Sequence, residues 1–326
     1  MVSMKIVTVL GATGAQGGSV VDYLLKSPEE YSVRAISRNS ESNAAKTLTA
    51  RGVEVVQADM DDVTSLITAF KGSYAIFAVT DFGQHFVKAG ADNAGATVAA
   101  DMEAAQGRNI VSAAETVIET LQHFLWSTLA DAMRISRGKI FVPHYHSKVI
   151  VDEYIRSRPT LLAKTTFIRC AYYSTNLASL FLQPVFVPTA GQYVQMQAVS
   201  ADTPIACIGD PRANLGAFVI ASLAQPDKTR RGKVVFAYLE VLTLGQLLQK
   251  WAKAHNTKAY YLQIQKEDYF TLFPGGAEEM DLGMRFWEFA RENWFVDDGS
   301  LSYRELDIDL TKLQSIEESM KFLPKK

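Results

Sequence analysis

The sequence has few cysteines, no excess of one charge and no long apolar run, and each shortage excludes a class of protein. Only two of the 326 residues are cysteines, Cys170 and Cys207, and both lie in apolar runs typical of strands. Buried thiols are therefore expected rather than a disulfide, which predicts a reducing compartment. With 33 basic and 35 acidic residues, the formal net charge is -2. No electrostatic feature thus predicts direct binding to nucleic acid or to a membrane.

Other familiar signals are also missing. No apolar run approaches the ~20 residues that cross a bilayer. Only MVSMK precedes the first apolar run, which leaves no room for a targeting peptide. We therefore expect a cytoplasmic protein, with the nucleus as the alternative compartment. The chain has no Gly-x-Ser-x-Gly elbow of a serine hydrolase and no zinc-ligand spacing, so we expect no metal.

What the chain does have is a cluster of glycines, GATGAQGG, at residues 11–18. The β-branched run KIVTVLGA before it predicts a buried strand, and SVVDYLLKS after it has helical periodicity. The spacing of Gly11, Gly14 and Gly17 is a variant of the dinucleotide fingerprint. One glycine permits a tight turn, one lets a pyrophosphate approach, and one lets helix and strand pack closely. A phosphate cradle is predicted, and a glycine-rich turn without a ligand is the alternative. The other predicted cradle residues are Thr13, Ala15 and Gln16.

The next predicted strand, residues 31–39 (YSVRAISRN), completes a βαβ unit. About twenty residues past the last glycine, an NAD site usually places Asp or Glu against the ribose 2′-hydroxyl. This chain has Arg38 at that place. A guanidinium pairs with a 2′-phosphate that a carboxylate would repel, so Arg38 predicts NADP rather than NAD. The alternative is that Arg38, like Arg34, is only a surface charge.

Two more polar residues follow strands of the predicted sheet. Asp59 comes after VEVVQ, where such folds close over the adenine. Its alternative role is to cap the helix that starts near Asp62. Thr80 comes after SYAIFAV, at the carboxyl edge where open α/β sheets bind ligands. Both are predicted to contact the cofactor.

Several segments, in their order along the chain, resemble the NmrA-like family of atypical short-chain dehydrogenase/reductases. They are VLGATGAQGGSVVDYLL, VRAISRN, VVQADMDD, AVTDF, HFLWSTL, VPHYHSKVIVDEYIR, TTFIRCAYYSTNL and TPIACIGDPRANLGAFV. The resemblance covers most of the chain and implies an α/β fold with two parts. One is a Rossmann core with a doubly wound parallel sheet that binds NADP(H), expected in residues 1–156. The other is a smaller C-terminal α+β substrate lobe, mainly in residues 157–326, from which TTFIRCAYY and KVVFAYLE return as strands to the Rossmann sheet.

Residues 83–108 look longer than the connection usual in that family. The stretch is rich in Ala and Gly. Its low hydrophobicity and small side chains predict a mobile loop that runs into a helix and caps the site.

The catalytic motif of the superfamily is altered in this chain. Active short-chain reductases usually carry Tyr-x-x-x-Lys on one helix face, and the tyrosine donates a proton to the substrate carbonyl. In PHYHSK the lysine is Lys148, and His144 occupies the place of the tyrosine. Tyr145 is displaced by one residue, about one hundred degrees around the helix, which makes it a poor replacement.

Lys148 is the stronger catalytic candidate, because relatives in the isoflavone-reductase branch work with a lysine and no catalytic tyrosine. The alternative is that Lys148 only binds the nicotinamide ribose. His144 is either a proton donor or a structural residue of the first helical turn. Ser127 ends the strand QHFLWSTL, where a serine of the superfamily hydrogen-bonds a substrate carbonyl; an ordinary strand-end hydroxyl is the alternative. Tyr173 is expected to overhang the nicotinamide, with buried packing as the alternative.

Two functions follow, because the family contains both reductases and dinucleotide-responsive regulators. The first is NADPH-dependent hydride transfer to a small carbonyl or enone, aromatic or polyketide in character. The second is an inactive NADP(H) redox sensor that regulates a protein partner.

Overall fold

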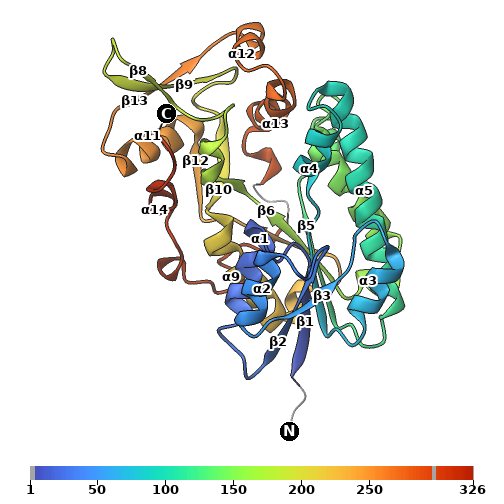
Figure 1. Cartoon of the computed structure of the whole chain (residues 1–326). Coiled ribbons are helices and arrows are strands. Elements are labelled where there is room, and N and C mark those ends of the chain that lie inside the picture. Colours follow the sequence, from blue (N-terminus) through green and yellow to red (C-terminus); the bar gives the residue numbers. More distant parts are fainter. Residues whose placement is uncertain (1–3, 296–298, 326) are drawn as a thin grey trace.

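The computed structural model describes residues 4–295 and 299–325. Its centre is a parallel seven-stranded sheet in the order β11-β6-β5-β4-β1-β2-β3 (Figure 1). These strands are β1 (Lys5–Val9), β2 (Tyr31–Ser37), β3 (Glu54–Gln57), β4 (Ala75–Ala78), β5 (His123–Thr128), β6 (Thr165–Cys170) and β11 (Lys233–Ala237). The order reverses between β1 and β4. The carboxyl ends of these two strands therefore border the crevice where such sheets bind ligands.

Helices cover both faces of this sheet, each over its own apolar cluster. On one face lie α1 (Ala15–Leu24), α2 (Asn43–Ala50) and α9 (Pro211–Ala224). On the other lie α3 (Val63–Phe70), α5 (Asn93–Thr116) and α7 (Pro143–Arg156). α1 and α9 approach closely because Gly216 has no side chain: a Cβ there would lie 2.5 Å from the carbonyl oxygen of Ser19.

A smaller lobe lies above the carboxyl edge of the sheet (Figure 1). It contains two three-stranded sheets, in the orders β12-β10-β7 and β13-β9-β8. Their strands are β7 (Tyr172–Tyr173), β8 (Val185–Val187), β9 (Gln192–Gln197), β10 (Pro204–Gly209), β12 (Glu240–Thr243) and β13 (Ala259–Gln263). The helices of the lobe are α11 (Leu244–Ala254), α12 (Lys266–Leu272), α13 (Ala277–Ala290) and α14 (Ile316–Met320).

Short helices complete the connections. They are α4 (Phe82–Lys88), α6 (Ala132–Ile135), α8 (Pro159–Leu162), α10 (Pro226–Thr229), η1 (Ser174–Ala178), η2 (Arg291–Trp294) and η3 (Leu310–Lys312). Among the described residues, no helix is long and apolar enough to cross a membrane.

The predicted doubly wound α/β sheet is confirmed, and TTFIRCAYY and KVVFAYLE do supply its strands β6 and β11. Both cysteines, Cys170 and Cys207, are buried and unpaired.

The prediction of a mobile loop in residues 83–108 is wrong. This stretch forms α4 and the first two-thirds of α5, which stand side by side as an arm over the sheet (Figure 1). We call residues 82–106 the helical arm. The small side chains serve close packing rather than mobility: just beyond the arm, a Cβ on Gly107 would lie 2.4 Å from Cγ2 of Val151 on α7. Asp92 caps α5 by accepting a hydrogen bond from the N–H of Gly95.

Candidate functional site

The glycine turn between β1 and α1 has the backbone geometry that the fingerprint requires. Gly11 has a φ of +64°, which glycine adopts without strain. A Cβ on Gly17 would lie 2.4 Å from the carbonyl oxygen of Gly11 and 2.6 Å from that of Leu10. The third glycine is therefore what lets α1 start directly against the turn. No side chain of the described residues caps α1, so its first N–H groups and its partial positive charge stay available to an anion.

Three predicted residues join in one hydrogen-bonded chain beside this turn. The Ser127 hydroxyl donates to Oε1 of Gln16 at 2.7 Å, and Nε2 of Gln16 donates to the Tyr173 hydroxyl at 2.7 Å. Burial, above all, raises the pKa of Tyr173 well above its usual value. Tyr173 is therefore a neutral phenol at physiological pH, fixed beside the end of β5.

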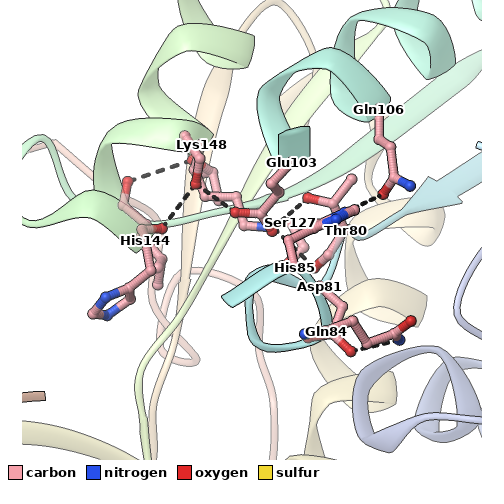
Figure 2. A network of polar contacts seen from close by, with 12 residues as sticks. Thr80, Asp81, Gln84, His85, Glu103, Gln106, Ser127, His144 and Lys148 are labelled. Atoms are coloured by element: carbon pink, nitrogen blue, oxygen red, sulfur yellow. Dashed lines mark hydrogen bonds and ion pairs between the residues drawn. The ribbon is translucent and has the colours of Figure 1, made fainter. Parts of the chain in front are cut away.

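Lys148 on α7 lies among polar groups at the end of β4 (Figure 2). Its side chain is 8% exposed, and its Nζ donates to the carbonyl oxygen of Thr80 at 3.0 Å and to the Thr80 hydroxyl at 2.5 Å. Oε1 of Glu103 is 2.8 Å from the same nitrogen. Oε2 of Glu103 accepts a hydrogen bond from the Ser147 hydroxyl. The Lys148 ammonium is thus held in one place, and a buried carboxylate balances its charge.

Sequence reasoning missed Glu103, because it lies in the stretch predicted to be mobile. Helical spacing could have found it. Glu103 lies three or four residues from Ala99, Ala100 and Gly107, which belong to the buried stripe of α5. A single carboxylate within an apolar stripe indicates a buried pair.

Four residues before Lys148, where the superfamily motif has a tyrosine, this chain has His144. The His144 ring is directed away from the Lys148 amino group (Figure 2), and its Nδ1 faces a carboxylate oxygen of Glu279 on α13. The ring also lies 5.7 Å from that of Phe82 on the arm. Tyr145 is buried and packs edge-on against Phe286 at 5.7 Å. Neither aromatic side chain is placed beside the ammonium group.

One turn further along α7, Asp152 anchors the end of β5. It accepts hydrogen bonds from Nε1 of Trp126 at 2.9 Å and from the Thr128 hydroxyl at 2.8 Å. Burial raises the pKa of Asp152 to about 7, more than these two bonds lower it. The Trp126 ring that Asp152 fixes lies 5.5 Å from Nζ of Lys148.

Arg38 lies just after β2 at an open hollow of about 740 Å³, which we call the arginine hollow. Its guanidinium donates to Oε1 of Gln84 at 3.1 Å, and Gln84 donates to Asp81 at 2.8 Å. Lys88, a second basic residue that the sequence reasoning missed, also lines the hollow. Arg34 differs, since it is bound by Glu54 at 2.8 Å and by two backbone carbonyls.

Asp59 follows β3, where its Oδ1 accepts from the N–H of Asp61 at 3.0 Å. The helix cap of α3 is Asp62 instead, which accepts from Thr64 and Ser65. The alternative role of Asp59 as that cap is therefore excluded. Within residues 4–295 and 299–325, no group of three or more His, Cys, Asp or Glu side chains is placed to hold a metal ion.

A second hollow, of about 400 Å³, separates the tip of the helical arm from α12 and α13. We call it the aromatic hollow. Its lining comprises Phe86, Ala91, Asp92, Asn93, Ala94, Phe270, Phe273, Pro274, Gly275, Gly276, Ala277, Glu278 and Glu279. Aromatic rings connect it to the site: Phe86 stacks on Phe82 at 5.5 Å, and the Phe82 ring lies tilted 5.7 Å from that of His144.

The family profile of the NmrA-like family matches residues 3–318. The chain belongs to the NmrA-like family. It is 29% identical, over 286 residues, to the NmrA-like family domain-containing oxidoreductase hkm9 of Aspergillus hancockii. The aligned region covers 85% of this chain and 80% of that protein.

Solved structures show the same fold. NmrA, a negative transcriptional regulator, in complex with NADP has a TM-score of 0.73 at 23% identity, over 98% of this chain and 96% of that one. The same regulator has also been solved with NAD. The Citrobacter sp. triphenylmethane reductase complexed with NADP(H) has a TM-score of 0.69 at 20% identity, over 98% and 99% of the two chains.

Proposed function

We propose that this NmrA-like protein is an NADPH-dependent reductase that transfers hydride to a small aromatic metabolite, with a carbonyl or enone as the class that the sequence predicts. The observation that carries this proposal is the fixed Lys148 ammonium at the carboxyl edge of the sheet, the edge at which the uncapped helix α1 also starts from its glycine turn. The proposal is also supported by the NmrA-like family, whose members include proteins named oxidoreductases.

The residues present fit the proposed cofactor. The turn has no room for a Cβ at Gly17, and the free N–H groups of α1 suit a pyrophosphate. Arg38 and Lys88 would bind a 2′-phosphate, Asp59 would lie at the adenine, and Thr80 and Tyr173 would border the nicotinamide half. The remaining contacts would come from Gly11, Thr13, Gly14, Ala15, Gln16 and Lys148. When bound, NADPH supplies the hydride.

The proposed roles of the chain's own side chains follow from their positions. Lys148, held by Thr80 and Glu103, would bind the nicotinamide ribose and stabilise negative charge that develops on a substrate oxygen. Ser127 would turn its hydroxyl from Gln16 to that oxygen. His144 has its ring held by Glu279 on the lobe, so we assign it a structural role.

Cofactor choice is the first test. Titration calorimetry of the wild type should show tighter binding of NADP than of NAD. Arg38→Ala should reduce this preference by about tenfold or more, because it removes a charge-assisted contact. Lys88→Ala should reduce the preference for NADP less. The control is Lys253→Ala, which changes an exposed lysine on α11 and should leave the preference unchanged. Equal affinities in the wild type would overturn the role of Arg38.

Turnover is the second test. Anaerobic incubation with NADPH and a panel of aromatic ketones, quinones and enones should give a loss of nicotinamide absorbance with at least one compound. Lys148→Ala should then lower turnover by about 10²–10⁴ and weaken NADP binding only modestly. Unchanged turnover would remove Lys148 from the mechanism.

The second candidate is an NADP(H) redox sensor that regulates a protein partner. It is favoured by the absence of a tyrosine four residues before Lys148 and by the resemblance in fold to a negative transcriptional regulator. No turnover with any compound, together with clearly different affinities for NADP⁺ and NADPH, would replace the reductase by the sensor.

A further inference from the structure

The wall of the arginine hollow is built mainly by the start of the helical arm. Arg38 alone comes from the end of β2. The other lining residues lie on α4 or directly before it: Asp81, Gly83, Gln84, Val87 and Lys88. The position of this short helix therefore determines which side chains face Arg38.

Arg38 has a neutral partner in this wall. Its guanidinium donates to Oε1 of Gln84 at 3.1 Å. Arg34, four residues earlier, is instead paired with the Glu54 carboxylate at 2.8 Å. An amide oxygen accepts a hydrogen bond but carries no net charge. Gln84 therefore orients the Arg38 side chain without neutralising it, and the positive charge stays available to an anion.

The orientation of the Gln84 amide is fixed from its other side. Nε2 of Gln84 donates to Oδ2 of Asp81 at 2.8 Å (Figure 2). An ionised carboxylate accepts hydrogen bonds and donates none, so the NH₂ group has to face Asp81 and the carbonyl oxygen is left for Arg38. Asp81 is held in turn, because its Oδ1 accepts the backbone N–H of Gln84 as the cap of α4.

The helix that carries Gln84 is anchored on its buried side. His85, the next residue, is 4% exposed, and its Nε2 lies 3.0 Å from Oε1 of Gln106 on α5 (Figure 2). Nε2 of Gln106 donates to Oδ1 of Asp61, after β3, at 3.1 Å. Contacts with α5 and with the segment after β3 thus fix α4, and Gln84 reaches Arg38 from a fixed base.

Positioning matters here because both side chains are exposed. An exposed arginine loses rotational freedom when it binds a phosphate, which weakens binding. A contact that restricts the guanidinium before the ligand arrives reduces this loss. The benefit reaches only a ligand that Arg38 binds, so it applies to a 2′-phosphate and not to a ribose 2′-hydroxyl.

We propose that Gln84 is a specificity-determining residue, which sets the preference for NADP over NAD by positioning Arg38 for the 2′-phosphate. This inference rests on the proposed function for its cofactor preference, but it can be tested without turnover. The probes are adenosine 2′,5′-bisphosphate and adenosine 5′-monophosphate, which differ only in the 2′-phosphate and contain no nicotinamide.

Calorimetry on the full chain should show tighter binding of the bisphosphate by the wild type. Gln84→Met keeps the length of the side chain but removes its hydrogen bonds. It should weaken bisphosphate binding by about threefold to tenfold and leave monophosphate binding unchanged. The matched control is Gln265→Met, at an exposed glutamine directly before α12 whose side chain makes no cap hydrogen bond, and it should change neither affinity.

A change of charge at the same position sharpens the test. Gln84→Glu should weaken bisphosphate binding by more than about tenfold at low salt, because the new carboxylate pairs with Arg38 and repels the phosphate. Added salt should reduce the difference between Gln84→Glu and Gln84→Met.

A double-mutant cycle separates positioning from a general effect on the hollow. Arg38→Ala should remove most of the preference for the bisphosphate. Gln84→Met in that background should cause no further loss, because Gln84 acts through Arg38. Losses that simply add would overturn the inference, as would equal weakening of both probes by Gln84→Met, since a merely structural role affects both.

The remaining outcomes distinguish this inference from the reductase proposal. Equal binding of the two probes by the wild type would reject the roles of Arg38 and Gln84 together. Lys148-dependent turnover of NADPH, with a preference that Gln84→Met leaves unchanged, would keep the reductase and reject the role of Gln84. A preference that depends on Gln84, without turnover of any compound, would keep this inference and reject the reductase.

Discussion

The glycine turn and the aromatic hollow are built in different ways. The turn is made by neighbours in the chain: within a few residues, Gly17 meets the carbonyl oxygens of Leu10 and Gly11. The hollow is made by segments that are far apart, for example Asn93 and Glu278, which are separated by 185 residues. The glycine turn is fixed by backbone contact, whereas the hollow is formed by side chains that can be substituted. We therefore expect a rigid nucleotide end and a variable substrate end.

The largest expected effect concerns the ion pair that ties the helical arm to the nucleotide end. Lys148→Met leaves Glu103 charged and buried, and Glu103→Gln leaves Lys148 in the same condition. Each single change should lower the free energy of unfolding by about 3–5 kcal/mol. The double variant should be less destabilised than the sum, since no charge is left unpaired. Chemical denaturation of the four proteins measures this coupling; strictly additive effects would show that the pair is not coupled.

A pair of glycine changes sharpens the contrast between the two ends. Gly17→Ala should lower the free energy of unfolding by about 3 kcal/mol and abolish binding of NADP, because its Cβ has no space between α1 and the turn. Gly283→Ala on α13 places a Cβ 3.6 Å from Cε1 of His144, an ordinary contact. It should stabilise the helix by about 0.5–1 kcal/mol. Thermal unfolding in the presence and absence of NADP tests both, and equal tolerance at the two positions would break the comparison.

A smaller effect is expected from pH at the anchor of β5. The pKa of Asp152 is raised to about 7 in the folded protein, above its usual value in an unfolded chain. Between about pH 4 and pH 7 the folded state therefore keeps a proton on Asp152 that the unfolded state has lost, so stability falls as pH rises until Asp152 is ionised. Asp152→Asn should consequently gain about 2 kcal/mol relative to the wild type between pH 5 and pH 8. A difference between the two proteins that stays constant with pH would refute this assignment.

The same contrast explains which features could be predicted from the sequence. The turn at Gly11, the parallel sheet and the place of Thr80 at its carboxyl edge follow from short motifs at strand ends, because the carboxyl ends of parallel strands meet at one edge. Glu103 and Lys88 could not be placed in this way. They depend on whether an alanine-rich stretch packs as a helix, and low hydrophobicity was the wrong guide, since small side chains also allow close packing against α7.

The wall of the aromatic hollow could not be predicted from the sequence for a different reason. His144 and Glu279 meet across 135 residues, and no local spacing relates them. Only the position of α13 above the sheet brings them together. The sequence did show that His144 replaces a tyrosine, but not where its ring is directed.

The placement of β6 and β11 has a consequence for how the protein is made. β5 gains its outer neighbour only when residues 165–170 arrive, and β11 follows some sixty residues later, at 233–237. While the chain leaves the ribosome, the partly built sheet therefore exposes an unpaired, wholly buried-type strand along one edge, which is the kind of edge that pairs with other chains. We therefore expect the chain to be most prone to aggregation before residues 233–237 are added to the sheet.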